Sequence, residues 1–198
     1  MSATSAPFGL RPAFHPSGLD RAQALAGGIP SGFSTDILKG QPVRYQTTAI
    51  GGTLGTITPA TTSGAWVGAF AGVQWTDTTG RARVSNYWPA NTAYTAGTCV
   101  AYFYNDQNIV YEIQADGSMA QTTIGNEYNF TNVTAGSTTT GLSQATLGSA
   151  TAVGNGSQGQ MRVVDIAPYP GNDWGDAYTI VRVVCANSQF FGAVTAIA

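Results

Sequence analysis

Prolines punctuate the N-terminal segment and restrict what it can form. Residues 6–16 (APFGLRPAFHP) carry three prolines. Proline fixes φ and lacks an amide donor, so neither a helix nor a central strand fits here. The segment also holds Phe8, Leu10 and Phe14, whereas disordered tails are poor in such side chains. We therefore expect residues 1–42 to form a long extended N-terminal arm that lies along another protein, with one possible helical turn at 19–26.

From residue 43 onward, short apolar runs alternate with turn residues. Strands are expected at 43–47, 54–58, 65–76, 81–87, 99–104, 109–114, 160–166 and 178–185, with a tight turn at 116–117 leading into 119–122. The small residues within 65–76 favour a bulged strand that passes through a core. No segment of the body keeps helical periodicity over three turns. The pattern predicts an all-β body at 43–198, an antiparallel β-barrel or sandwich. It leaves open whether the polar stretch 131–158 is ordered.

The chain is unusually poor in charge. Charged residues make up 9% of it and the net charge is −2, against about 25% charged residues in an average protein. Hydroxyl and amide groups cost less to bury than ions do. Such a surface suits a protein that is packed against neighbours, and the alternative is a secreted β-protein with a Thr- and Ser-rich exterior.

Several function classes lack their usual signals. The basic residues are scattered, which argues against nucleic acid as a partner. No run of 18 apolar residues is present, so we expect no membrane span. The first five residues show neither a basic nor an apolar signal-peptide region, which argues against secretion.

Catalytic chemistry is equally poorly supported. The single histidine, His15, lies in the arm and is expected to be a solvated or interface ring. Asp106 and Glu112 are predicted to be a turn residue and an outward strand position of a hairpin rather than a glycosidase pair. The oxygen-rich loop 172–176 (NDWGD) lacks the EF-hand pattern. We predict no enzyme, no cofactor and no metal site.

Both cysteines, Cys99 and Cys185, lie in apolar strand-like runs. Free cysteine behaves as a small core hydrophobe, which favours two buried thiols. A single disulfide between two core strands remains the alternative.

Motifs along most of the chain resemble a family of tailed-bacteriophage capsid decoration, or cement, proteins. The matching stretches are 6–12 (APFGLRP), 39–43 (KGQPV), 67–77 (VGAFAGVQWTD), 85–90 (SNYWPA), 110–117 (VYEIQADG), 124–125 (IG), 141–143 (GLS) and 162–166 (RVVDI). The resemblance implies a structural virion protein, made in the host cytoplasm, that binds the outside of the major capsid protein lattice. It implies neither an enzyme nor a cofactor.

A cement protein gains affinity when its arm and body engage together, because the second contact is then intramolecular. Phe8, Leu10 and Phe14 are the expected anchors in pockets of the partner, and Arg11 is expected to pair with a capsid carboxylate. The alternative for these residues is a tail that folds back on its own body. Self-association is also expected, with a trimer favoured over a dimer.

A second function class remains open, a glycan- or receptor-binding β-module on the virion surface. Trp66 and Trp75 are expected in the core. Trp88 and Trp174 are the candidates for a stacking platform on the surface.

Overall fold

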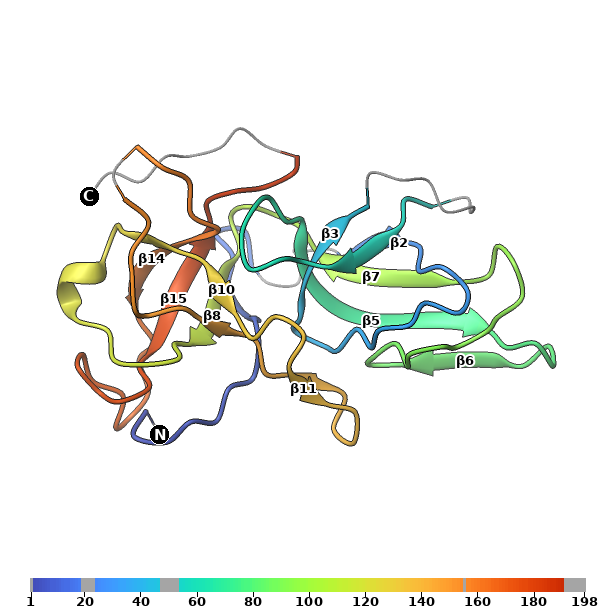
Figure 1. Cartoon of the computed structure of the whole chain (residues 1–198), viewed down its shortest axis with the longest axis horizontal. Coiled ribbons are helices and arrows are strands. Elements are labelled where there is room, and N and C mark those ends of the chain that lie inside the picture. The colour runs from blue at the N-terminus through green and yellow to red at the C-terminus, as the bar shows by residue number, and fades with distance from the viewer. Residues whose placement is uncertain (1, 19–23, 47–53, 155, 191–198) are drawn as a thin grey trace.

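Two lobes built from antiparallel sheets lie side by side in the computed structural model, which describes residues 2–18, 24–46, 54–154 and 156–190 (Figure 1). The first sheet has the order β1-β8-β15-β14-β9 and the second has the order β2-β7-β5-β3-β4, with β6 paired to β5. The all-β class predicted from the sequence is confirmed, and the paired sheets are consistent with a β-sandwich body.

The first lobe contains β1 (Arg11–Phe14), β8 (Val110–Gln114), β9 (Glu127–Tyr128), β14 (Met161–Ile166) and β15 (Ile180–Cys185). Two short ribbons pair β10 (Phe130–Thr131) with β13 (Thr146–Leu147), and β11 (Gly136–Ser137) with β12 (Leu142–Ser143). A 3₁₀ turn, η2 (Gln121–Thr123), replaces the continuation expected after the turn at 116–117. The second lobe contains β2 (Ala24–Gly27), β3 (Pro42–Tyr45), β4 (Ile57–Pro59), β5 (Gly68–Thr76), β6 (Ala82–Ser85) and β7 (Val100–Tyr104).

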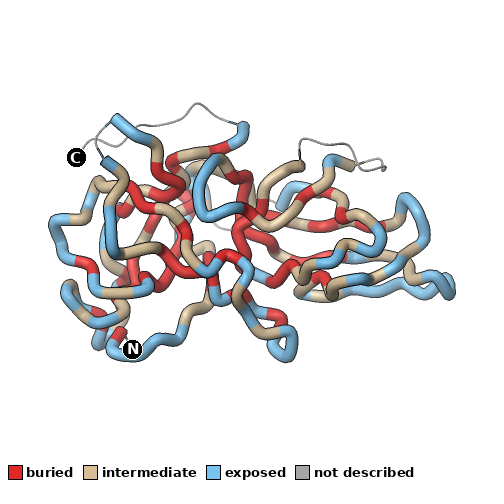
Figure 2. Tube along the Cα trace, in the orientation of Figure 1, coloured by how far each residue is buried: buried red, intermediate tan, exposed pale blue. Residues whose placement is uncertain are grey.

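Each lobe has its own apolar core, and buried residues run through the middle of both and across their junction (Figure 2). Trp66, Tyr111 and Phe130 are among the large side chains of the first core. Phe70 and Trp88 belong to the second. Such burial is the main stabilising contribution to a domain of this size.

In the order of its described strands, the chain passes from the first sheet to the second and back. It begins in the first sheet with β1, builds the second sheet from β2 to β7, and returns with β8. Strands β7 and β8 therefore belong to different sheets, and the hairpin expected around the loop 105–108 is wrong. Local turn residues predicted the loop correctly but carry no information about which strand each flanking segment joins.

Several local predictions are confirmed. The strands expected at 65–76, 81–87, 160–166 and 178–185 are present as β5, β6, β14 and β15. In the structure β5 and β6 form a hairpin, and β14 pairs with β15. The predicted bulge in β5 lies between Phe70 and Gly72, where the register with β7 shifts. The polar stretch 131–158, whose order the sequence left open, includes β11, β12 and β13. The predicted helical turn falls partly on 19–23, outside the described residues, and its second half is strand β2. Pairing with β7 overrides the weak helical preference of so short a segment.

The N-terminal segment is extended, but its described residues do not stand apart from the body. Strand β1 pairs with β8 and β2 pairs with β7, and Leu10, Ile29 and Ile37 are almost fully buried. Packing these apolar side chains against the chain's own sheets removes them from water without a partner. Pro12 is accommodated because β1 pairs only with β8 among the described strands and so lies at the sheet edge.

The two cysteines are free, as favoured above, but only Cys99 is buried and Cys185 is partly buried. Cys99 lies in the second core and Cys185 packs against the first. Burial raises the pKa of the Cys99 thiol and raises that of Cys185 to about 12. In the described part of the chain, no helix has the length and apolarity needed to cross a membrane.

Candidate binding site at the junction of the lobes

The N-terminal segment reaches the junction through two close backbone crossings. The amide of Leu10 donates to the Gly40 carbonyl at 2.8 Å, and the amide of Gly40 donates to the Phe70 carbonyl at 2.8 Å. Gly9 has φ +71°, and a Cβ there would lie 2.6 Å from the Gly40 oxygen. Only glycine fits such a conformation and approach without strain. Three segments distant in sequence are therefore fixed against one another.

A pocket of about 440 Å³ opens beside these crossings. It is lined by Phe8, Leu10, Arg11, Pro12, Lys39, Gly40, Ala69, Phe70, Tyr104 and Leu142. A second pocket of about 250 Å³ shares Phe8 and Arg11 with the first and is also lined by Gln114, Tyr169 and Ile180. The larger volume falls within the range of about 300–1,000 Å³ found for ligand sites in proteins.

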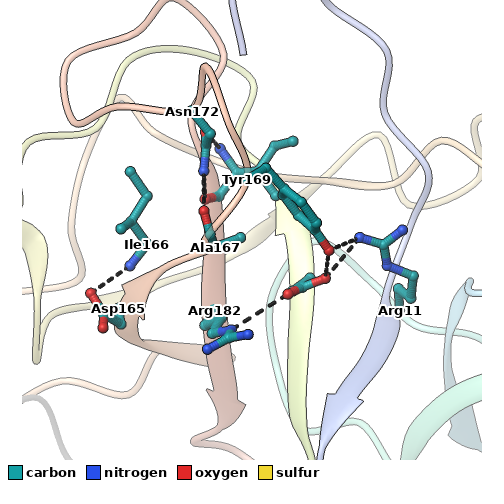
Figure 3. A network of polar contacts seen from close by, with 9 residues as sticks. Arg11, Asp165, Ile166, Ala167, Tyr169, Asn172 and Arg182 are labelled. Atoms are coloured by element: carbon teal, nitrogen blue, oxygen red, sulfur yellow. Dashed lines mark hydrogen bonds and ion pairs between the residues drawn. The ribbon is translucent and has the colours of Figure 1, made fainter. Parts of the chain in front are cut away.

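Arg11 is held by a carboxylate of its own chain rather than left free for a partner. It donates to Oε2 of Glu112 at 2.7 Å and also contacts the Tyr169 hydroxyl. Arg182 donates to Oε1 of the same carboxylate at 3.4 Å. Arg11, Tyr169 and Arg182 converge from different segments in Figure 3. The guanidinium also stacks over the rings of Phe8 and Tyr169, at 4.8 and 5.4 Å from the centroids.

The buried carboxylate of this network is charged. The side chain of Glu112 is 5% exposed. Burial alone would raise its pKa, but the hydrogen bonds from Tyr169 and Arg11 and the charges of Arg11 and Arg182 together hold the pKa below its ordinary value. Burial and the neighbouring carboxylate raise the pKa of Tyr169. The outward position predicted for Glu112 is wrong, because Arg11 and Tyr169 cover the face of β8 on which it lies.

His15 provides a second attachment of the N-terminal segment. The ring is buried, and its Nε2 lies 3.0 Å from Oδ2 of Asp106. Its Nδ1 accepts from the Ser17 amide at 3.1 Å. With Nδ1 as acceptor, the proton of a neutral ring is on Nε2 and is donated to Asp106. The solvated or interface ring expected from the sequence is wrong, because the ring is enclosed against its own chain.

The six predicted contact residues divide into two groups. Leu10 is 2% exposed and Trp88 is 0% exposed, so neither is a surface anchor. Trp174 is partly buried against the first core. Phe14 is 54% exposed, Phe8 is partly exposed in both pockets, and Arg11 is exposed at their rim. Trp66 is buried in the first core as predicted, whereas Trp75 is partly buried and packs against the second.

Lys39 and Leu142 were not identified as site residues. Lys39 is the chain's sole lysine, and its side chain forms no ion pair within the described ranges. Leu142 is 43% exposed and borders the same pocket. Both occur in motifs of the resemblance, but only the parallel bridge between residues 39 and 142 brings them together.

The described residues gather no three His, Cys, Asp or Glu side chains in a metal-binding arrangement. In the loop 172–176, the Asn172 amide bonds to the backbone of Ala167 and Ile180, and Asp176 accepts from the Asp173 amide at 2.9 Å. These oxygens stabilise the turn itself.

Comparisons of this chain with protein-family models, with curated proteins and with solved structures found no match.

Proposed function

We propose that this chain is a structural virion protein, a capsid decoration or cement protein that binds the outside of the major capsid protein lattice. It bridges neighbouring subunits and so stabilises the expanded head. The sequence motifs that resemble such proteins support this role, as does the low content of charged residues. The protein acts by contact alone, without catalysis or a cofactor, and copies associate on the shell, with a trimer favoured over a dimer.

The observation that carries the proposal is the set of exposed apolar side chains on β1 and at the pocket beside it. Phe14 is 54% exposed at the end of this strand, and Phe8 and Leu142 border the adjacent pocket. Exposed apolar groups gathered around a pocket are typical of protein contact surfaces. A surface with few ions is also desolvated at low cost when subunits pack.

The test is cosedimentation of the full chain with expanded empty heads of the phage that encodes it. Deleting residues 1–42 is unsuitable, because the deletion removes β1, β2 and core residues such as Ile37. Phe14→Ser removes the exposed anchor instead. Val84→Ser is the matched control, because Val84 is 83% exposed on β6 in the other lobe.

We expect the wild-type chain and Val84→Ser to bind in lattice stoichiometry and Phe14→Ser to bind at least tenfold more weakly, the effect of losing a contact worth about 1.4 kcal/mol. A wild-type chain that does not bind heads would contradict the capsid role. Equal binding of all three proteins would keep the role but move the contact away from β1. The glycan-binding alternative loses its platform at Trp88, which is buried.

A further inference from the structure

We propose that the pocket at the lobe junction binds a polypeptide segment in which a large apolar side chain is followed by a carboxylate. Only the identity of the protein that carries this segment rests on the proposed function. The pocket concerned is the one that Phe8, Lys39 and Leu142 border.

The wall of the pocket is apolar and open. Of its lining residues, Leu10, Phe70 and Ala69 are buried and form what is called the floor here, and Leu142 remains 43% exposed. The floor is rigid because the backbone of Gly40 bonds to both Leu10 and Phe70. A rigid concave surface with an exposed leucine loses little entropy on binding and gains free energy when an apolar side chain displaces water.

The charge at the rim decides which apolar segment fits. Arg11 already has its counter-ion in Glu112. Lys39 is exposed and forms no ion pair within the described part of the chain. The pocket therefore presents one uncompensated positive charge next to an apolar surface. A carboxylate beside the inserted side chain complements that charge, whereas a basic segment is repelled.

A polypeptide occupant is favoured by the length of the site. The smaller pocket continues beyond Phe8 and Arg11, and Gln114 and Tyr169 offer polar groups there. A short extended segment can place one side chain in the larger pocket and run over Phe8 towards the smaller one. Two adjoining pockets of this kind match the way in which extended peptides are bound, with alternate side chains inserted.

The test is an NMR titration of the ¹⁵N-labelled full chain with the peptide N-acetyl-Gly-Phe-Asp-Gly-amide and with its Asn counterpart. We expect saturable amide shifts confined to the pocket, notably at Lys39, Gly40 and Leu142, at peptide concentrations up to about 10 mM, enough to saturate a Kd of about 1 mM. The Asn peptide is expected to bind about threefold more weakly, the size of an exposed ion pair.

Substitutions then separate the contribution of the Lys39 charge from that of the apolar Leu142 side chain. Lys39→Gln should make the Asp and Asn peptides bind equally, whereas Arg81→Gln, which removes an exposed cation in the β5–β6 turn, should preserve the difference. Leu142→Ser should weaken both peptides, and Val84→Ser should weaken neither.

Scattered or non-saturable shifts, or equal binding of the two peptides to the wild-type chain, would overturn the proposal. Shifts at Lys39 and Leu142 that depend on protein concentration without peptide would identify a second copy of this chain as the occupant and would also overturn it. Because the probe is a peptide, these outcomes are independent of whether the chain binds heads.

Discussion

Arg11 donates a hydrogen bond of 2.7 Å to Oε2 of Glu112 and so joins residues 101 positions apart in the sequence. The two residues are also paired across β1 and β8. This contact fixes the N-terminal segment against the first lobe, and it places the aromatic ring of Phe8 between the two pockets.

Glu112→Gln tests the contribution of this network to stability. The substitution leaves Arg11 and Arg182 facing a neutral side chain, and we expect the free energy of unfolding to fall by about 2 kcal/mol. This is less than the 3–5 kcal/mol typical of a fully buried pair, because Arg11 is half exposed. Urea denaturation measures the change. Asp165→Asn, an exposed carboxyl on β14, is the control and should cost under about 0.5 kcal/mol.

Acid should destabilise the chain through the same carboxylate. The pKa of Glu112 lies below its ordinary value for the reasons given above, and the pKa of Asp106 is lowered by the amide of Asn108 and by His15. A lowered folded-state pKa gives stability that is fully present above the unfolded-state values of about 4 and is lost as the pH falls through the folded-state values. We expect the urea midpoint to be constant from about pH 7 to 5 and to fall below about pH 4.5. Glu112→Gln should make the fall shallower, and an unchanged slope would contradict the role assigned to Glu112.

Leu10 and Phe14 should behave differently although both were predicted as anchors. Leu10→Ala removes a buried side chain of the first core and should cost about 2–5 kcal/mol in unfolding free energy. Phe14→Ala removes an exposed ring and should cost less than about 0.5 kcal/mol. Thermal and urea unfolding of the two variants measure this contrast. A large loss for Phe14→Ala would show that its ring packs on the body in solution.

Trp88 should act as a core residue. It packs at 5.5 Å from Trp75 and 5.9 Å from Tyr94, measured between ring centroids. Its buried Nε1 has no hydrogen-bond partner in the described structure, so Trp88→Phe loses packing but no hydrogen bond. We expect Trp88→Phe to lower the free energy of unfolding by about 1–3 kcal/mol.

Titration of the tryptophan fluorescence of the wild-type chain with a glycan panel should give no change. A response that Trp174→Phe abolishes would instead favour the glycan-binding alternative.

The thiols should be inert in the folded protein. The thiolate is the reactive form, and burial raises the pKa of Cys185 to about 12 and also raises that of Cys99. At pH 8 we expect no reaction with Ellman's reagent until the chain is unfolded, when both thiols react. Rapid modification of the native chain would mean that β15, which carries Cys185, or the segment before β7, which carries Cys99, opens readily.

Local patterns predicted much of the fold because the physics behind them is local. Short apolar runs separated by turn residues identified β3, β5, β14 and β15, and β5 and β6 proved to be joined as a hairpin. Proline identified β1 as unsuitable for the middle of a sheet, and it lies at an edge. These features depend on the fixed φ and missing amide hydrogen of proline and on the spacing of apolar side chains along a strand. All three can be read from the sequence alone.

The site was predicted only in part, for the opposite reason. Phe8, Arg11 and Phe14 were identified as contact residues, but Leu10 and Trp88 are buried, and Lys39 and Leu142 were missed. Burial depends on which distant segment covers a side chain. The sequence pattern of an extended arm with apolar residues does not distinguish packing on the body of its own chain from packing on a partner.

The sequence by itself determined an all-β chain with an extended, proline-bearing start, few charges and two cysteines in apolar runs, whose pairing it left open. Only the tertiary structure decided that β7 and β8 enter different sheets, that the N-terminal segment packs on both lobes, and that Glu112 is buried between two arginines. Strand formation follows from residue preferences over a few positions. Strand partners and burial follow from the free energy of packing segments about 100 residues apart, such as Arg11 and Glu112, which no local pattern records.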